Sequence, residues 1–173
     1  MTPFNSKAVA NFLLDLARAQ GEQLTPMKLQ KLVYYAHGWC LALTGKPLIN
    51  EVVQAWSFGP VVRSLYEEFR EFGANPITRP AMEAVYLDES NVKYGCPSLD
   101  DKKGPDVDFA KSLLKRIWEV YGRYSGVQLS NMTHAPGTAW NRVYKLYNEN
   151  IPKNATIPDD WIREEFTPKE KSA

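Results

Sequence analysis

Residues 25–45 read TPMKLQKLVYYAHGWCLALTG, and this stretch predicts a single long helix. Thr25 suits the N-cap, Pro26 suits the first helical position, where its missing N–H costs nothing, and Gly45 suits the end. Because apolar residues follow two opposite sides and such a helix is usually enclosed, we expect a central helix about 28 Å long. One broad face carries Leu29, Leu32, Val33, Ala36, Trp39, Cys40 and Leu43, and the opposite line carries Met27, Tyr34, Gly38 and Leu41.

Gly38 falls inside this helix, although glycine there is less favourable than alanine by about 1 kcal/mol. We expect the close approach of a neighbouring element to compensate for it. Further helices are predicted by apolar residues at helical spacing and by their capping residues. They cover about 5 or 6 to 20, 61 to 72 after a start at Gly59-Pro60, 106–124, 127–133, 138–147 and 158–166.

Strand signals are few. Residues 51–58 could form a short strand or part of a helix, and residues 84–87 are strand-like within the Pro- and Gly-rich stretch 75–105. A stretch of that length without a long periodic run is often functional or mobile. The predicted fold is mainly α: a compact single-domain helical bundle around the helix at about 26–44. It has at most a small β hairpin or short strands near 51–58 and 82–88. The domain covers 1–167, and 168–173 is a charged tail.

Composition limits the classes of function. Among 173 residues, 21 Lys and Arg face 20 Asp and Glu, which gives a net charge of +1. Nucleic-acid binders usually carry a basic excess or stripe, so nucleic acid is not an expected partner. No apolar run approaches the roughly 20 residues needed to span a bilayer, and no signal-peptide core precedes the domain. We therefore expect a cytoplasmic protein with no membrane partner and with two reduced cysteines.

Catalytic and metal-binding signals are weak. His37 and Cys40 lie three residues apart, but two ligands do not make a zinc site, and a buried structural Cys40 fits the apolar face better than a nucleophile. His134 allows two interpretations. It could bond a backbone carbonyl in a turn before a helix capped by Thr138, or it could face a partner or ligand. Phosphate-binding glycine motifs and the G-x-S-x-G motif are absent from the sequence, so we expect no cofactor, no metal and no enzymatic activity.

Aromatic residues suggest where a partner could bind. Trp and Tyr are enriched at binding hot spots, and Tyr34, Trp56 and Phe58 cluster around two predicted helices and their connection. We predict a partner-binding role for these three, for Tyr86 and Tyr94 in the irregular stretch, and for His134. The stretch 75–105 is the leading candidate for choosing the partner.

Several blocks resemble the Panacea-domain family, also described as SocA-like, GepA-like or phage-associated. Residues 28–39, KLQKLVYYAHGW, resemble its opening signature, and GKPL at 45–48 and AWSFGPVV at 55–62 follow at the family's spacing. Leu129-Ser130, Thr133-His134 and Trp140 resemble its C-terminal signature.

This resemblance implies a mainly helical antitoxin of a toxin–antitoxin system. Such a protein neutralises a cognate toxin, encoded by an adjacent gene, through direct protein–protein binding. An alternative is a proteolytic adaptor that delivers the toxin to a protease. A second alternative, an enzyme acting on a nucleotide or small molecule through His134, rests on that residue alone. We interpret the signature blocks as mostly structural.

Overall fold

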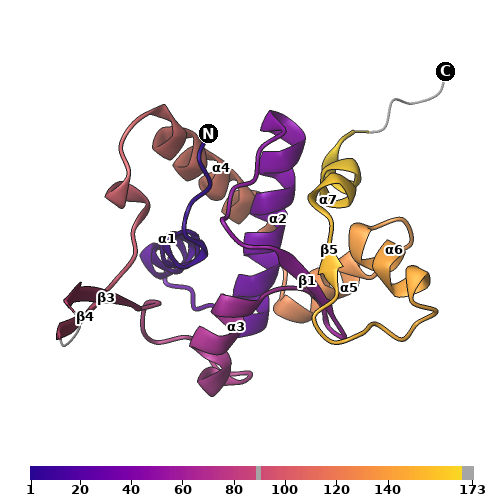
Figure 1. The fold of residues 1–173 in the computed structure, drawn as a ribbon, viewed down its shortest axis with the longest axis horizontal. Helices are drawn as coiled ribbons and strands as arrows, with labels where there is room; N and C mark the ends of the chain where they lie inside the picture. The colour runs from indigo at the N-terminus through magenta and orange to yellow at the C-terminus, as the bar shows by residue number, and fades with distance from the viewer. Residues whose placement is uncertain (89–90, 169–173) are drawn as a thin grey trace.

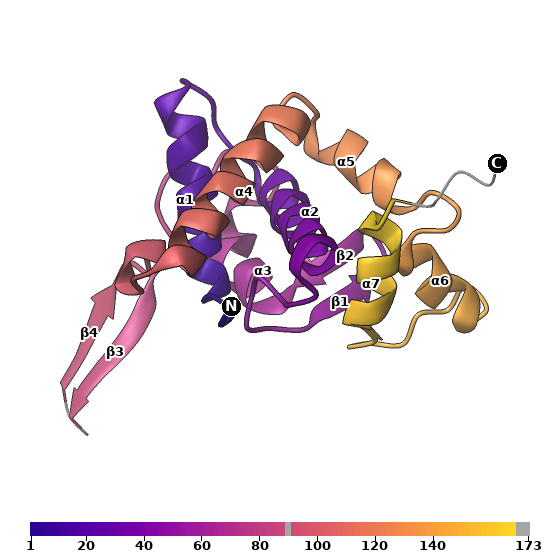
Figure 2. The same cartoon turned by 90° about the horizontal axis from the view of Figure 1, so that it is seen from above.

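The structure is a computed structural model that describes residues 1–88 and 91–168, without the side chains of 86–88. Its central element is α2 (Pro26–Thr44), which begins and ends as predicted. The Thr25 hydroxyl caps it by accepting from the Lys28 N–H, and Gly45 ends it in the left-handed conformation, with φ of 68°. Every residue from Leu29 to Gly38 is buried. The predicted enclosed helix is therefore confirmed, and Figures 1 and 2 show it in the middle of the molecule.

Helices surround α2 on several sides. α1 (Ser6–Ala19) and α4 (Pro105–Tyr121) pack against it and against each other, and α5 (Gly126–Thr133) and α7 (Asp159–Phe166) pack elsewhere along it. α3 (Arg63–Phe69), which continues into a 3-10 turn at Arg70–Phe72, contacts it too, and α6 (Ala139–Leu146) packs on α5 and α7. A second short 3-10 turn covers Leu99–Asp101. The mainly α fold is confirmed, and none of the described helices has the length and apolar character that crossing a membrane requires.

A three-stranded antiparallel sheet lies beside α2. β1 (Val53–Trp56) pairs with β2 (Gly59–Val62) on one side and with β5 (Thr156–Ile157) on the other. This settles the open alternative for residues 51–58 in favour of a strand. The predicted helix start at Gly59-Pro60 is wrong, because these residues open β2 and α3 begins only at Arg63. β2 is an edge strand, and an edge tolerates the missing N–H of Pro60.

A second hairpin extends from the body of the molecule (Figures 1 and 2). β3 (Glu83–Asp88) pairs with β4 (Asn91–Gly95), so the strand predicted at 84–87 is confirmed. The buried Asn11 of α1 fastens the base of this hairpin on both sides. Its amide donates to the carbonyls of Ala81 (3.1 Å) and Pro97 (2.9 Å) and accepts from the Ala81 N–H (2.7 Å). The hairpin is thus anchored to α1 on both sides, at Ala81 and at Pro97.

The glycine inside α2 has the predicted close neighbour. A Cβ added at Gly38 would overlap the ring of Phe166 on α7. That ring also packs edge-on against Tyr34, Tyr35 and Trp39 of α2. Gly38 therefore lets α7 approach the central helix closely, and the contact area offsets the lost helix propensity.

We predict that Gly38→Ala destabilises the protein by up to about 2 kcal/mol. Overpacking a tight core costs about 1–3 kcal/mol, which exceeds the roughly 1 kcal/mol gained in helix propensity. Urea unfolding of the variant measures the change. In a Phe166→Leu background the same substitution should be neutral or stabilising. An equal loss in both backgrounds would show that the Phe166 ring is not the obstacle.

Candidate functional site

Side chains from three helices hold the tip of the β1–β2 hairpin. The backbone carbonyls of four of its residues, 56, 57, 58 and 60, each face a nitrogen or hydroxyl group from α2, α5, α6 or the residue that ends α5. Because the groups come from separate helices, the tip is fixed in one conformation relative to the bundle. The pairs are Trp140 Nε1–Trp56 O (2.8 Å), His134 Nε2–Ser57 O (3.2 Å), Ser130 Oγ–Phe58 O (2.8 Å) and Lys31 Nζ–Pro60 O (2.9 Å).

The end of the hairpin is held by Gln30 of α2. Its buried amide donates to the Val62 carbonyl and accepts from the Val62 N–H, each at 2.9 Å. The side chain thus completes the backbone hydrogen bonds of the edge strand. Gly59, with φ of 104°, lies so close to α2 and α5 that an added Cβ would meet Thr133 Oγ1 at 2.6 Å and Lys31 Nζ at 2.7 Å. The position admits only glycine.

His134 lies in the turn that one of its two interpretations predicts. Nδ1 is 2.6 Å from the Ser130 carbonyl and Nε2 is 3.2 Å from the Ser57 carbonyl. Thr138 caps α6 by accepting from the Asn141 N–H, as predicted. Both ring nitrogens therefore face backbone carbonyls, which leaves neither directed at a substrate. The ring lies against Trp140, with 3.9 Å between centroids.

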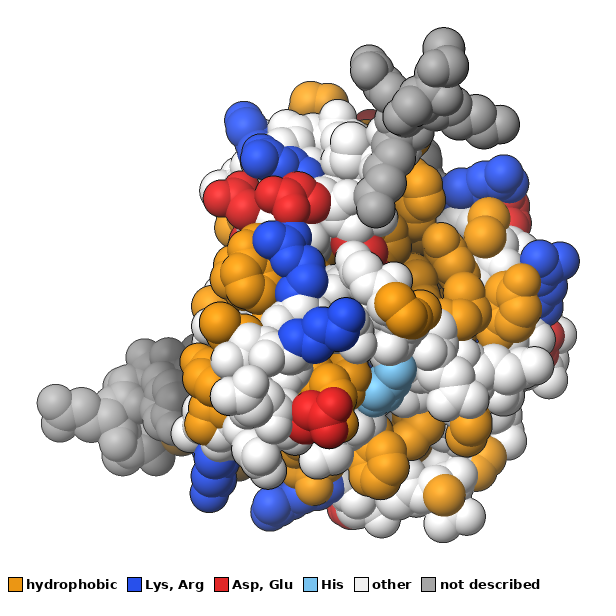
Figure 3. Space-filling view, turned by 90° about the vertical axis from the view of Figure 1, so that its right-hand side faces the viewer, with side chains coloured by type: hydrophobic (Ala, Val, Ile, Leu, Met, Phe, Trp, Pro, Cys, Tyr) orange, Lys and Arg blue, Asp and Glu red, His pale blue; other side chains and the backbone are white. Residues whose placement is uncertain are grey.

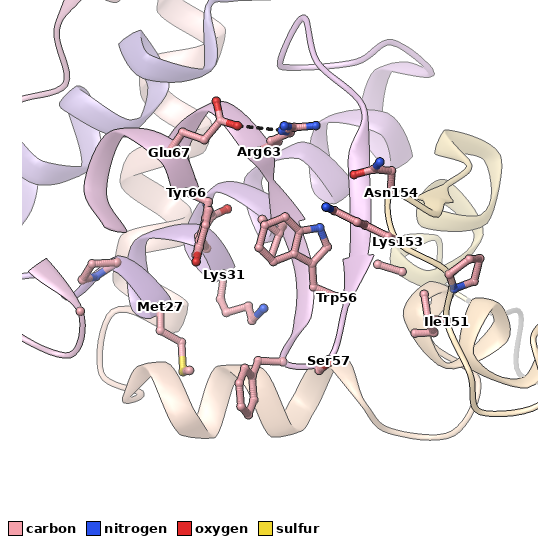
Figure 4. Close-up of a pocket in the computed structure, with 17 residues that line it drawn as sticks. Met27, Lys31, Trp56, Ser57, Arg63, Tyr66, Glu67, Ile151, Lys153 and Asn154 are labelled. Atoms are coloured by element: carbon pink, nitrogen blue, oxygen red, sulfur yellow. Dashed lines mark hydrogen bonds and ion pairs between the residues drawn. The ribbon is translucent and has the colours of Figure 1, made fainter. Parts of the chain in front are cut away.

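An apolar groove runs alongside this fixed hairpin, with a volume of about 660 Å³. Figure 4 shows its residues converging from α2, the hairpin, α3 and the segment 151–154. Arg63 and Glu67 form an ion pair at the rim, with 2.8 Å between Nε and Oε1. Much of the lining is aromatic or aliphatic, a composition typical of binding sites. It includes Met27, Ala55, Trp56, Phe58, Val61, Tyr66, Ile151 and Pro152.

Lys31 is the exceptional residue in this lining. Its side chain lies in the core beneath the hairpin and the whole residue is only 2% exposed. Its ammonium group donates to the Pro60 carbonyl, and no ion pair among the described residues includes it. Burial lowers the pKa of Lys31 to about 7, because the charged form is poorly solvated there. A cation without a neighbouring carboxylate thus lies at the groove.

Three of the predicted partner-binding residues come together here. Trp56 lines the groove and packs edge-on against Tyr66, with 4.7 Å between ring centroids. Phe58 points outward at the hairpin tip and is 71% exposed. His134 supports the tip from beneath. Figure 3 shows hydrophobic side chains gathered on the face of the molecule that carries α6 and α7 in Figure 1.

The other predicted partner-binding residues lie elsewhere. Tyr34 must be corrected to a core residue, since it is 1% exposed and its hydroxyl donates to Glu165 at 2.6 Å. Burial beside this carboxylate raises the pKa of Tyr34. Tyr94 is 72% exposed on β4, away from the groove. The Tyr86 side chain lies outside the described residues.

Cys40 and His37 occupy the core positions that their pattern favours. Cys40 is fully buried, and burial raises the pKa of its thiol to about 11, which disfavours a nucleophilic thiolate. His37 is also buried, with Nε2 3.2 Å from Asp159 of α7. In the described part of the chain, no three His, Cys, Asp or Glu residues are grouped so that they could hold a metal ion.

Neither Lys31 nor Gln30 is among the site residues predicted from the sequence. A signal for Lys31 was present, however, because it falls between Met27 and Tyr34 on the apolar line at helical spacing. A lysine on an otherwise apolar line is expected to bury at least its aliphatic stem. The acceptor and the groove beside it depend on the hairpin, which local pattern did not reveal.

Comparison with known proteins places the chain in a family. The family model described as "Antitoxin SocA-like, Panacea domain" matches residues 29–141, a span that begins beside Gln30 and ends just after Trp140. The chain is also 32% identical over 162 residues to "Antitoxin SocA" of Caulobacter vibrioides (strain NA1000 / CB15N). The alignment covers 94% of this chain and 82% of that relative. No solved structure matches the chain.

We predict that Gln30→Leu lowers the free energy of unfolding by about 2 kcal/mol or more. The substitution keeps the apolar packing but leaves the buried N–H and C=O of Val62 without partners, and each unpaired group costs about 1–3 kcal/mol. Chemical denaturation measures the loss. The matched control Gln23→Leu, at an exposed position, should stay within about 0.5 kcal/mol of wild type. Equal effects at both positions would contradict a special role for Gln30.

Proposed function

This chain belongs to the SocA-like antitoxin family with a Panacea domain, and from that premise we propose that it neutralises a cognate toxin by direct protein–protein contact. The toxin is the product of an adjacent gene, and binding takes place in the cytoplasm. The observation that carries this proposal is the rigid hairpin tip, which holds the exposed Phe58 beside an apolar groove.

The geometry of the tip favours tight binding. A loop that is already fixed loses little conformational entropy on association, so more of the contact energy remains as affinity. Aromatic anchors in the middle of an apolar area are typical binding hot spots. Phe58, Tyr66, Val127 and Met132 are all exposed large hydrophobic residues on the hairpin and the neighbouring helices α3 and α5. A specific interface of roughly 1,600 Å² in total is feasible around them.

The β3–β4 hairpin is a second region suited to contact. Val85, Val92 and Tyr94 are exposed on it, and its two strands pair only with each other in the described part of the chain. A two-stranded hairpin is marginally stable in water, so a partner that covers it would stabilise it. We propose that this hairpin contributes to the choice of toxin, as expected for the stretch 75–105.

The separation of these two regions favours a second candidate function. Figure 2 shows the β3–β4 hairpin at one end of the molecule and β1, β2 and α6 towards the other. An adaptor must hold a toxin and a protease at the same time, which requires two separate surfaces. Delivery of the toxin to a protease is therefore the alternative.

For direct neutralisation, we predict that Phe58→Ala weakens toxin binding by about 2 kcal/mol or more, which is the loss typical of a hot spot. Stability should change by no more than about 0.5 kcal/mol because the side chain is exposed. Isothermal titration with the adjacent gene product measures the affinity, and co-expression measures rescue of growth. Leu43→Ala serves as the control, because it removes an exposed apolar side chain (62% exposed) near the C-terminal end of α2. This variant should leave the affinity and the rescue of growth unchanged.

Tyr94→Ala separates the two surfaces in the same assays. If Tyr94→Ala weakens toxin binding and Phe58→Ala does not, the toxin binds at the β3–β4 hairpin and not at the groove. If the wild-type protein neither rescues growth nor co-purifies with the gene product, the proposal of direct neutralisation fails.

The adaptor alternative predicts a shorter toxin half-life in cells when this protein is present. A pulse–chase experiment measures that half-life with wild-type protein and with Tyr94→Ala. Full neutralisation with an unchanged half-life would exclude delivery to a protease.

A further inference from the structure

The ammonium group of Lys31 has no charged partner in the fold. It lies 2.9 Å from the Pro60 carbonyl, which satisfies one of its three N–H donors. The residue is only 2% exposed, so water has little access to its two remaining N–H donors. A buried charge without a counter-charge destabilises a folded protein. The fold therefore loses stability by keeping a cation at this position.

The hairpin does not require this cation. Trp140, Ser130 and Gln30 donate to other carbonyls of the same two strands and their turn, and the buried Val53, Ala55 and Val62 pack the sheet into the core. A methionine at position 31 would keep most of the apolar contact of the lysine stem. Residues that reduce stability without a structural need are found at functional sites, so the charge is better explained by a ligand.

The place of Lys31 in the groove indicates the shape of that ligand. In Figure 4 its side chain reaches toward the hairpin, with Met27 on one side of it and Trp56, Lys153 and Ile151 on the other. Apolar surface thus continues past the ammonium group in both directions. A ligand that uses the whole groove carries its polar group in the middle of an extended chain, between two apolar parts.

The donors of the site indicate the chemistry of that polar group. Lys31 is the one buried point charge among the described residues of the groove, Lys153 is an exposed lysine on the segment 151–154, and Arg63 is already paired with Glu67. The hairpin turns four carbonyls toward its supporting side chains. Phosphate recognition generally uses several donors, such as backbone N–H groups or arginine forks. A single lysine suits one carboxylate, which would supply the missing counter-charge.

We propose that the groove beside the β1–β2 hairpin binds an extended segment of the partner protein whose acidic side chain, an Asp or Glu, forms an ion pair with Lys31. This inference rests on the proposed function in that the segment belongs to a protein partner. Flanking apolar residues of the segment contact Met27 on one side and Trp56 on the other. The pair forms away from water, so it contributes strongly to the specificity of the interface.

Lys31→Met tests this pairing in the complex. The midpoint of thermal unfolding of the free protein should change little, because removal of an unpaired buried charge offsets the loss of the hydrogen bond to the Pro60 carbonyl. Affinity for the toxin should fall by about 30-fold or more, since the partner's carboxylate loses its counter-charge on burial. Lys46→Met removes an exposed lysine and should change neither quantity. A fall in the unfolding midpoint with unchanged affinity would overturn the proposal in favour of a structural lysine.

Short peptides test the same site without the toxin and in the wild-type protein. NMR titration with acetyl-Phe-Glu-Phe-amide should shift the signals of Lys31 and Trp56. The matched acetyl-Phe-Gln-Phe-amide should not. Binding of the glutamine peptide as tightly as the glutamate peptide would overturn the ion pair. A third peptide, acetyl-Phe-Gln-Phe with a free carboxyl end, carries its carboxylate at the end of the chain. If only this peptide binds, the site recognises a chain terminus, and the assignment to an acidic side chain is overturned.

The pH dependence of glutamate-peptide binding identifies the titrating group. The carboxylate favours protonated Lys31, whose pKa in the free protein is about 7, so binding above pH 7 takes up a proton. Affinity should be level just below pH 7 and fall by up to about tenfold per pH unit above it. The other charged or titratable groups at the groove are Arg63, Tyr66, Glu67 and Lys153, and His134 lies behind the hairpin. A slope that persists in Lys31→Met would assign the titration to one of these groups and overturn the role of Lys31.

The two failures are distinguishable. If the toxin does not bind wild-type protein while the glutamate peptide does, direct neutralisation fails and the carboxylate site stands. If the toxin binds wild type and Lys31→Met equally, and the glutamate peptide does not bind, the carboxylate site fails alone.

Discussion

The enclosure of α2 is the constraint on which the rest of the structure depends. Helices α1, α3, α4, α5 and α7 and strand β2 all pack against this one helix, so its buried residues meet several different neighbours. Close packing of this kind permits side chains only where their volume and polarity match the surroundings. Gly38 illustrates the volume requirement, because its missing side chain makes room for the ring of Phe166.

The polar residues of α2 follow from the same constraint. Three of them, Gln30, Lys31 and His37, are buried together with the apolar residues, and each points toward a particular neighbour. Gln30 and Lys31 bond the β2 backbone, while His37 faces Asp159 at the start of α7. The described part of the chain leaves only His37 Nδ1 among buried side-chain polar atoms without a hydrogen-bond partner. The central helix therefore specifies where the hairpin and the last helix dock.

The residues that resemble the family signature acquire a common role in the structure. Gln30, Lys31, Ser130, His134 and Trp140 are far apart in sequence, yet all of them face the backbone of β2 or the hairpin tip. The structure therefore shows which part of the fold these signature residues support, namely the β1–β2 hairpin. These residues immobilise a short turn, and the turn presents Phe58 and Trp56 at a groove. The supporting residues and the proposed partner contact are thus neighbouring parts of one site.

Local pattern was sufficient for the helices. The two apolar lines, Thr25, Pro26 and Gly45 determined α2 to the residue, and Thr138 and the helical spacing located α6, because caps and periodicity act within a few residues. Pairing across the chain decided the rest. Gly59-Pro60 suits the start of a helix as well as an edge strand. Pairing with strand β1 decides that these residues form an edge strand. Whether Tyr34 was exposed, and whether the charge of Lys31 had a partner, depended on α7 and on the hairpin. Burial and electrostatic environment are set by residues distant in sequence, and so only the tertiary structure revealed the groove and the unpaired lysine within it.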